Sequence, residues 1–595
     1  MIRSRAAKSS RPGAPSSGGN QHYRSARAVA PMKRSKGTYS RLNWKVLKMM
    51  IFLIGAVVMV VFYQRLHIAE DLTTAGSASE SGSSISSGNG GAQIVSNAKR
   101  SNAERNFKSE RQGRSLARGI SGLPLSETPA LVGGSRGHIQ CEVDVDELVY
   151  WNDPQGTRDV NFQSPFTGKS HGGDGEEKTK YLTFEPDRGG WNNIRMNLEN
   201  VFILAAATGR TLVMPPAVPV YLLTHDKEEK HKGFADFYNL YSDEFQHRVK
   251  IISTEEFITR EGGEDGQFPI LESKREEVLK SSIECDKRAK SDISCDHIWE
   301  YLESKAFVPQ FNGTTCLIFD EDSFEGQTVS SENAERVKSF CGEKRIPYYI
   351  TEATQEEQLI HLKNAKGWRI MAHYYGYMYF TNTAIFNYYK RFVRDFMHYH
   401  DEIYCAAGKI ILALQLEGEK LGFKIDEEGG GGFSSMHVRR GDLQYKAVKI
   451  SAEEWYDNLK DTWQDKEIIY IATDERNKTF FDPIKEHNNV KFLDDYWDYA
   501  DLGKLDGNYM GMIDTIIASR GRSFAGTFRS TFTGYINRMR GYHGMSMKDS
   551  YYGFLEKKKV THEWLDYYDG TTFALEWPDG WIGIDGDVEP SKVKF

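Results

Sequence analysis

The chain has 595 residues, of which 39% are hydrophobic and 12% aromatic, so it can bury more core than one typical domain holds. Its formal charge of −7 is unevenly distributed: residues 1–69 carry thirteen Lys or Arg residues and no Asp or Glu, which leaves about −20 for the remainder. A folded region this acidic excludes nucleic acid as an expected partner.

The basic arm leads into an apolar run over residues 46–63. From Met49 to Tyr63 fifteen successive residues are uncharged, and Lys48 can snorkel to the interface, so the run just spans a bilayer. Twelve of the thirteen basic residues precede Met49, and the positive-inside rule then keeps residues 1–45 in the cytosol. The pattern predicts a type II signal anchor rather than a cleaved signal peptide, whose basic and apolar regions are shorter.

A polar segment follows the anchor. Residues 64–137 are rich in small and charged side chains and poor in aromatic ones, which predicts a flexible luminal stem. Because all the cysteines lie after the anchor and none has the C-x-x-C spacing of a zinc site, disulfides are the favoured interpretation and free buried thiols the alternative. The six cysteines are Cys141, Cys285, Cys295, Cys316, Cys341 and Cys405. Four of them lie within residues 285–341, where disulfides are expected to stabilise an insertion.

Two glycosylation acceptor sites fit the luminal topology. They are Asn312 in Asn-Gly-Thr and Asn477 in Asn-Lys-Thr. Because a short apolar span suits a thin membrane, we expect a single-pass protein of the Golgi or endoplasmic reticulum membrane with its catalytic part in the lumen.

The first strongly patterned segment begins near Tyr181, where the folded part is expected to start. Gly189-Gly190-Trp191-Asn192-Asn193 precedes apolar residues at helical spacing from Ile194 to Ala205, and residues 211–214 form an apolar strand pattern. Glycines let a loop pass close to a ligand, and a helix N-terminus favours an anion. The segment therefore predicts a glycine loop, a helix and a strand, although a plain tight turn is the alternative for the glycines.

A second patterned region lies in the C-terminal half. An aromatic helical stretch is expected over residues 373–416, and an acidic, glycine-rich break at 427–432 suits a hinge. Strands are then expected at 433–438, 467–472, 491–493 and 522–525, with helices at 512–519 and 530–540. Such alternation predicts a parallel sheet with ligands at the carboxyl ends of its strands.

Two polar segments lie at such strand ends. His437-Val438-Arg439-Arg440-Gly441-Asp442 follows one strand, and Ser530-Thr531-Phe532 opens the last helix with Ser530 or Thr531 at its N-cap. A guanidinium stays charged and its fork matches phosphate oxygens, while free helix N–H groups favour anions. Together the segments predict a diphosphate site, and hence a nucleotide-activated sugar as ligand.

Four blocks of the chain resemble the GDP-fucose protein O-fucosyltransferase family, especially its broad plant-type branch. They are residues 189–216, 437–442, 469–474 and 512–536. The resemblance implies an α/β fold of GT-B type, with two Rossmann-like domains facing each other across a cleft. The implied parts are an acceptor-side domain at 178–426 with a cysteine-rich insertion, a donor-nucleotide domain at 433–560 and an acidic aromatic tail at 561–595.

Family membership further implies an inverting, metal-independent transfer of fucose from GDP-fucose to a hydroxyl of a protein or glycan, with no cofactor. Arg439 resembles the family arginine that contacts the donor diphosphate and is the expected catalytic residue. Asp514 falls where the family recognises guanine, whose N1–H and amino group are adjacent donors that a carboxylate accepts together. The other implied donor-binding residues are His437, Ser530, Thr531, Phe532, Gly190, Asn192 and Asn193.

The sequence does not identify the general base or the acceptor of the transfer. Some family members carry a glutamate in the Gly-rich loop, where this chain has Arg188-Gly189-Gly190. Glu185 and Asp187, just before that loop, are expected to be solvated surface groups. A base-free dissociative route remains an alternative, as do a sister activity with a donor such as UDP-rhamnose and a non-catalytic donor-binding or glycan-binding protein. Stacking on acceptor sugars is one interpretation of the tail aromatics, and a packed or partly exposed aromatic tail is the favoured one; these residues are Trp564, Tyr567, Tyr568, Trp577 and Trp581.

Overall fold

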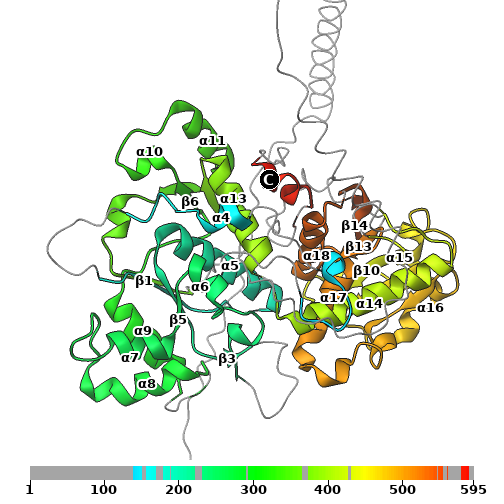
Figure 1. Cartoon of the computed structure of the whole chain (residues 1–595), viewed down its shortest axis with the longest axis horizontal. Coiled ribbons are helices and arrows are strands. Elements are labelled where there is room, and N and C mark those ends of the chain that lie inside the picture. The colour runs from blue at the N-terminus through cyan, green and yellow to red at the C-terminus, as the bar shows by residue number, and fades with distance from the viewer. Residues whose placement is uncertain are drawn as a thin grey trace, which may run out of the picture. The chain divides into compact units, whose positions relative to one another are not determined.

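The computed structural model describes most residues between 139 and 587, all of which belong to one compact unit (Figure 1). The segments left out within this range are 150–155, 169–177, 188, 221–230, 288, 290–292, 365–372, 398, 427–429, 442, 546, 554–558, 561–575 and 577. The expected tail, anchor and stem at residues 1–137 lie outside the described residues. Among the described helices, none combines the length and the apolar character that a bilayer crossing requires.

The first half of the folded chain is built on a four-stranded parallel sheet in the order β5-β2-β1-β8. Its strands are β1 (Tyr181–Phe184), β2 (Thr211–Met214), β5 (Ile251–Ser253) and β8 (Leu359–Leu362). Helix α5 (Trp191–Thr208) connects β1 to β2, so the predicted loop, helix and strand are confirmed. Because both faces of the sheet are covered, every residue of β1 and β2 is buried.

A second, three-stranded parallel sheet in this half was not predicted. It has the order β7-β6-β9, from β6 (Thr315–Phe319), β7 (Ile346–Tyr349) and β9 (Met378–Phe380). Strand β9 interrupts the stretch expected to be helical over residues 373–416. The reason is tertiary, because β9 pairs with β6 and Phe380 stacks on Phe319 at 4.5 Å between ring centroids.

The remaining elements of the first half are helices and one short hairpin. The hairpin is β3 (Val218–Pro219) with β4 (His231–Lys232). The helices are α3 (Asp146–Val149), α4 (Gly156–Val160), α6 (Asp243–Arg248), α7 (Thr254–Glu261), α8 (Arg275–Ile283), α9 (Cys295–Lys305), α10 (Glu321–Phe324), α11 (Ser331–Cys341), α12 (Tyr374–Tyr377), α13 (Thr383–Phe396) and α14 (Asp401–Lys420).

The second half is built on a six-stranded sheet in the order β12-β11-β10-β13-β14-β15, parallel except for the last pair. Its strands are β10 (Ser434–Val438), β11 (Ile468–Thr473), β12 (Asn489–Lys491), β13 (Phe524–Thr527), β14 (Ser550–Gly553) and β15 (Lys559–Val560). The strand predicted at 522–525 starts two residues later, at Phe524, where pairing with β10 begins. The strand predicted at 491–493 lies two residues earlier, as β12, because pairing with β11 begins at Asn489.

Four helices accompany this sheet: α15 (Ala452–Leu459), α16 (Asp482–Lys485), α17 (Met510–Ser519) and α18 (Thr531–Tyr542). Helix α14 of the first half lies alongside α17 (Figure 1). One buried apolar cluster extends from Leu198 on α5 through Ile411 on α14 to Ile516 on α17. The two halves therefore share a continuous core.

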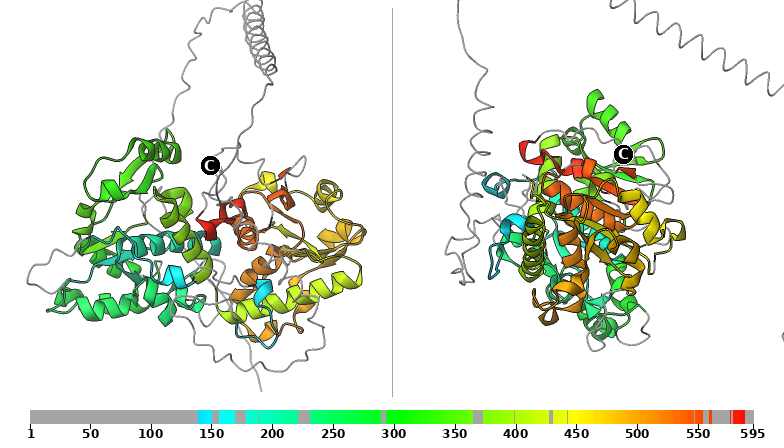
Figure 2. Two further views of the ribbon diagram at one scale, coloured as in Figure 1. Left: turned by 45° about the horizontal axis from the view of Figure 1, so that its top comes forward. Right: turned by 90° about the vertical axis from the view of Figure 1, so that its right-hand side faces the viewer.

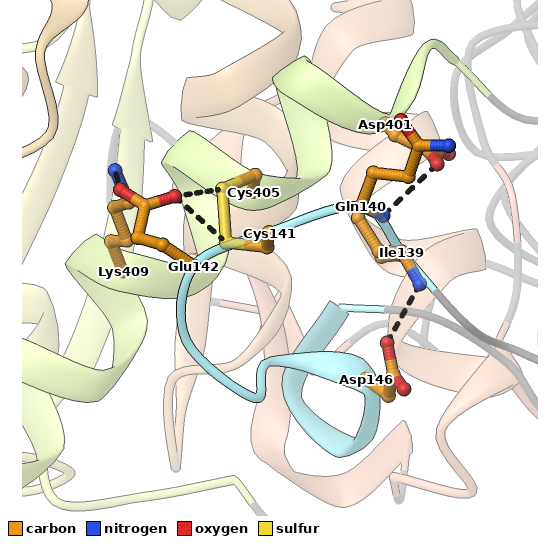
Figure 3. The surroundings of a disulfide bond; sticks show 8 residues. All are labelled: Ile139, Gln140, Cys141, Glu142, Asp146, Asp401, Cys405 and Lys409. Carbon is orange, nitrogen blue, oxygen red and sulfur yellow. Dashed lines mark hydrogen bonds and ion pairs between the residues drawn. A yellow bond between two sulfur atoms is a disulfide. The ribbon is translucent and has the colours of Figure 1, made fainter. Parts of the chain in front are cut away.

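All six cysteines form disulfides, as the favoured interpretation predicted. The expected stapling of residues 285–341 is confirmed by Cys285–Cys295 and Cys316–Cys341. The third bridge, Cys141–Cys405, closes a loop of 264 residues and ties the segment before the first sheet to α14 (Figure 3).

This third bridge shows that the expected start of the folded part near Tyr181 is wrong. Val145 and Phe166 are each only 1% exposed, and the Gln140 N–H donates to Asp401 on α14 at 3.1 Å (Figure 3). A covalent tie and buried apolar side chains order this segment, although its sequence carries no strong periodicity.

Candidate functional site

The loop after β10 holds Arg439 at the carboxyl end of the sheet. β10 lies between β11 and β13, so three loops converge at this edge. The Arg439 N–H donates to Thr527 Oγ1 at 3.0 Å, and that hydroxyl donates to the His437 carbonyl at 3.1 Å. The Arg439 side chain is 21% exposed, with Nε 4.0 Å from Asp474 Oδ2. Thr527, the last residue of β13, thus fixes the backbone from which this guanidinium projects.

Asp474, which follows β11, shapes the same loop. Its Oδ1 accepts the Arg440 N–H at 2.7 Å and its Oδ2 the Gly441 N–H at 3.0 Å. A Cβ on Gly441 would lie 2.7 Å from Asp474 Oδ2, so the loop can approach this carboxylate only because residue 441 is glycine. Asp474 therefore supports the loop through both carboxylate oxygens.

The second arginine of the motif turns away from this position. Arg440 Nε donates to Glu475 at 2.9 Å, and its guanidinium lies 3.9 Å from the centre of the Phe480 ring. The sequence alone allows Arg440 either to bind a ligand or to brace the loop, for example by pairing with Asp442, and these contacts support the bracing role. Asp442, its alternative ion-pair partner, lies outside the described residues.

His437 joins β10 to the start of α18. It is 4% exposed, its Nδ1 lies 2.7 Å from Thr533 Oγ1, and its ring stacks on Phe532 with centroids 4.4 Å apart. Burial first, and the charge of Arg439 second, lower the pKa of His437 to about 3. The imidazole is therefore neutral at physiological pH and lies between the loop after β10 and the start of α18.

Helix α18 begins with an unused hydroxyl. Ser530 occupies the predicted N-cap position, yet its side chain makes no capping hydrogen bond. Its Oγ is buried and has no hydrogen-bond partner among the described residues. The preceding Arg529 has a φ of +63°, a conformation that non-glycine residues rarely adopt and that is concentrated at functional sites. A buried hydroxyl beside free helix N–H groups fits an anionic ligand.

Asp514 lies on α17, facing the sheet. Its Oδ1 accepts a hydrogen bond of 2.5 Å from the hydroxyl of Tyr470, a fully buried residue of β11. Burial raises the pKa of Asp514 to about 7, against a smaller lowering effect of the Tyr470 hydrogen bond. The carboxyl group is thus oriented through one oxygen and titrates near neutral pH.

The glycine loop before α5 presents the residues predicted from the first half. Gly190 is the N-cap of α5, and Gly189 has a φ of +145°. A Cβ on Gly189 would lie 2.7 Å from Asn193 Nδ2, so the loop can pass this close to Asn193 only because residue 189 is glycine. Asn193 Oδ1 is buried with no hydrogen-bond partner among the described residues, whereas Asn192 Oδ1 accepts from Arg195 Nε at 3.2 Å. Asn193 therefore has an unused acceptor, and Asn192 is held by the helix.

The starts of α5 and α18 lie at the same end of a helix pair. The Arg195 guanidinium lies 3.7 Å from the centre of the Tyr535 ring, and each of these residues is the fifth of its helix. One turn further on, Glu199 pairs with Arg538. Because the contacts advance together along both helices, the helices run in the same direction. Their positive ends, with Gly190 and Ser530 as N-caps, therefore point the same way.

The carboxylates before the glycine loop are buried, so the expectation that they are solvated is wrong. Glu185 is 7% and Asp187 5% exposed, because both follow the buried strand β1 into the interior. One oxygen of Glu185 lies within 4.8 Å of ligand-type atoms of Glu303 and His361, but Lys287 already pairs with Glu185 at 2.9 Å. These groups form an ion-pair cluster, and the sequence prediction of no metal stays a prediction.

A cavity of about 160 Å³ opens at the carboxyl ends of β2 and β5. Pro216, Phe234, Tyr241 and Thr254 contribute to its lining, and Phe234 is a neighbour of Trp191, the first residue of α5. The first half thus has a partly apolar recess beside its glycine loop.

Several residues of the site were not found from the sequence. Thr527 lies two residues beyond the strand predicted at 522–525, Tyr470 lies on a predicted strand but was not singled out, and Arg529 was overlooked beside Ser530. A hydroxyl at a strand end and a cation before an N-cap are signals that could have indicated Thr527 and Arg529. Glu576, which reaches α5 and α18 from the tail, gives no local signal.

Parallel sheets with a cation, a buried hydroxyl and helix N-termini at the carboxyl ends of their strands define an anion-binding α/β protein of the nucleotide-binding class. The sequence profile of the GDP-fucose protein O-fucosyltransferase family matches residues 181–543. The chain belongs to this family and is a glycosyltransferase. Among curated proteins, none matches the sequence of this chain.

Solved fucosyltransferase structures are similar to the chain at low identity. Fucosyltransferase NodZ from Bradyrhizobium is 14% identical, with 61% of this chain and 93% of that chain covered and a TM-score of 0.30. POFUT1 in complex with GDP-fucose is 12% identical, with coverages of 63% and 99% and a TM-score of 0.32. A mutant of Arabidopsis thaliana FUT1 in complex with GDP is 10% identical, with coverages of 66% and 73% and a TM-score of 0.29.

Proposed function

We propose that this glycosyltransferase moves fucose from GDP-fucose to a hydroxyl group of a protein or glycan, with inversion and without a metal ion. The observation that carries the proposal is that the backbone of Arg439 is bound to the strand that leads into the start of α18. The Arg439 N–H donates to the hydroxyl of Thr527, and Thr527 ends β13, three residues before Ser530. A cation, a buried hydroxyl and free N–H groups there suit a diphosphate.

The nucleotide would be recognised by the pair of Asp514 and Tyr470. The Tyr470 hydroxyl holds one carboxyl oxygen of Asp514, which fixes the orientation of the group. An ionised carboxylate accepts both adjacent donors of the guanine edge, whereas uracil offers only one such donor. This favours a GDP-sugar over the UDP-sugar alternative.

In the proposed reaction the acceptor oxygen attacks C1 of fucose from the face opposite the departing diphosphate, and the C1–O bond to the phosphate breaks. Negative charge grows on the leaving diphosphate, so a fixed Arg439 stabilises the transition state more than the ground state. The acceptor proton passes to bulk water after most of that bond has broken, and no protein base is assigned because Glu185, just before the glycine loop, is already paired with Lys287.

We further propose a GT-B arrangement, with an acceptor domain at 178–426 and a donor domain at 433–560, held in the lumen of the Golgi or endoplasmic reticulum by an anchor at 46–63. Three disulfides support an oxidising compartment. Both sequon asparagines, Asn312 and Asn477, are exposed.

A thermal-shift panel of GDP, UDP, ADP and their sugars tests the donor. A selective ligand at about one hundred times its Kd adds about 2.7 kcal/mol of stability, so GDP should raise the melting temperature clearly and UDP should not. Mass spectrometry of GDP-fucose turnover, with and without EDTA, tests transfer and the need for a metal, and NMR of the product's anomeric proton tests inversion. Stabilisation by UDP alone, or by GDP without turnover on a broad acceptor panel, would reject the proposal.

A further inference from the structure

The C-terminal tail places one carboxylate in the interior of the molecule. Glu576 is 1% exposed and accepts hydrogen bonds from Arg195 Nη2 at 2.7 Å, from the Tyr375 hydroxyl at 3.2 Å and from Arg538 Nε. Glu199, 2% exposed, accepts from Arg195 Nη1 at 2.5 Å and from Arg538 Nη2 at 2.9 Å. Arg195, Glu199, Arg538 and Glu576 therefore form a closed and charge-neutral ion ring, in which cations and anions alternate.

The ion ring joins three parts of the chain that are distant in sequence. Arg195 and Glu199 lie on α5, Arg538 lies on α18, and Glu576 follows the region of residues 181–543 that the family profile matches. No family role can therefore be carried over to Glu576.

The tail around Glu576 is firmly attached to both halves. Lys390 Nζ on α13 donates to the Gly580 carbonyl at 2.8 Å, and Arg394 on the same helix pairs with Asp585 at 2.8 Å. Trp581 is 2% exposed and packs against Tyr542 of α18, as expected for a packed aromatic residue. In Figure 2 the end of the described tail lies beside α18.

We propose that Glu576 is a positioning residue for the transfer reaction, an inference that rests on the proposed function. By holding Arg195 and Arg538 together, it fixes α5 against α18, and hence the glycine loop of the first half against Ser530 of the second. Arg195 also donates to Asn192 Oδ1 at 3.2 Å, so the ion ring reaches the first turn of α5, which follows the glycine loop.

Loss of the Glu576 charge leaves two buried guanidiniums that share one carboxylate. Their repulsion separates α5 from α18, because an uncompensated buried charge is strongly unfavourable. The residues proposed to hold GDP, Arg439, Ser530 and Asp514, all belong to the second half. Donor binding should therefore survive, whereas the alignment of acceptor and donor should not.

The test compares Glu576→Gln with Asp585→Asn in the full chain. Asp585 belongs to the same tail, but among the described residues its side chain pairs with Arg394 of α13 and not with α5 or α18, so its variant is the matched control. For Glu576→Gln we expect kcat to fall at least about tenfold, because a misplacement of about 1 Å costs up to about 100-fold, while the Kd for GDP stays within about twofold. For Asp585→Asn we expect both quantities to stay near wild type.

Unchanged kcat in Glu576→Gln, a parallel loss of GDP affinity, or an equal loss of kcat in Asp585→Asn would overturn the proposal. Amide hydrogen exchange over residues 189–200 gives a readout that does not depend on turnover. The exchange rate should rise in Glu576→Gln and stay unchanged in Asp585→Asn. If it does not rise in Glu576→Gln, the proposal is overturned even if the wild type is inactive. An inactive wild type alone rejects the proposed function. If Glu576→Gln does not fold, Glu576→Asp decides by the same criteria, since it keeps the charge and shortens its reach.

Discussion

Replacement of Arg439 by alanine should separate catalysis from stability. The Arg439 side chain is 21% exposed and its Nε lies 4.0 Å from Asp474, whose oxygens also accept two backbone N–H groups of the loop. The loop therefore keeps its support, and we expect the free energy of unfolding to change by less than about 1 kcal/mol. Loss of a fixed donor to the developing diphosphate charge costs about 3 kcal/mol, or roughly 100-fold or more in kcat.

The adjacent Arg440 gives the matched control. It pairs with Glu475 and lies over the Phe480 ring, so Arg440→Ala should lower the free energy of unfolding by about 1 to 2 kcal/mol after allowance for solvent screening. Its kcat should stay within about threefold of wild type, because its guanidinium points away from the diphosphate position. Urea unfolding and GDP-fucose turnover measure both quantities. A folded Arg439→Ala protein with near-normal kcat, or equal losses of kcat in the two variants, would refute this reasoning.

Three further outcomes are expected. The pKa of Asp514 is raised to about 7 in the folded state from 3.8, so between about pH 4 and about pH 7 the wild type should lose stability relative to Asp514→Asn as the pH rises. Over the same range its affinity for GDP should increase, because the carboxylate becomes ionised. Urea unfolding and calorimetry across this range measure the two trends, and neither would appear if Asp514 titrated normally. Ser530→Ala should leave stability within about 0.5 kcal/mol yet weaken GDP binding about tenfold, whereas Ser451→Ala, which removes a working N-cap on α15, should cost about 1 kcal/mol and leave GDP binding unchanged. Asn312→Gln and Asn477→Gln should each abolish one mass shift on glycosidase treatment of protein from a eukaryotic secretory host, and unshifted wild-type protein would argue against a luminal location.

The parts of the site that the sequence predicted are those with local causes. A buried apolar strand followed by Arg439, and a serine before an apolar helix, are both visible within about ten residues, and β10 and α18 begin within one residue of the expected positions. The three-stranded sheet of the first half was not predicted, because the segment that contains β9 has helical composition on both sides. Only its pairing with β6, more than fifty residues earlier, decides its conformation.

The ion ring shows a different limit of sequence reasoning. Arg195 and Glu576 are 381 residues apart, and a lone acidic residue in an acidic tail carries no pattern that indicates its partner. The geometry of α5 and α18 nevertheless explains why a buried carboxylate is required there. Two helices that run in the same direction bring their positive ends together, and further along the pair the guanidiniums of Arg195 and Arg538 add two buried positive charges. Glu199 offsets only one of these, so close packing of α5 against α18 requires a second buried carboxylate, and Glu576 supplies it from outside the region shared with the family.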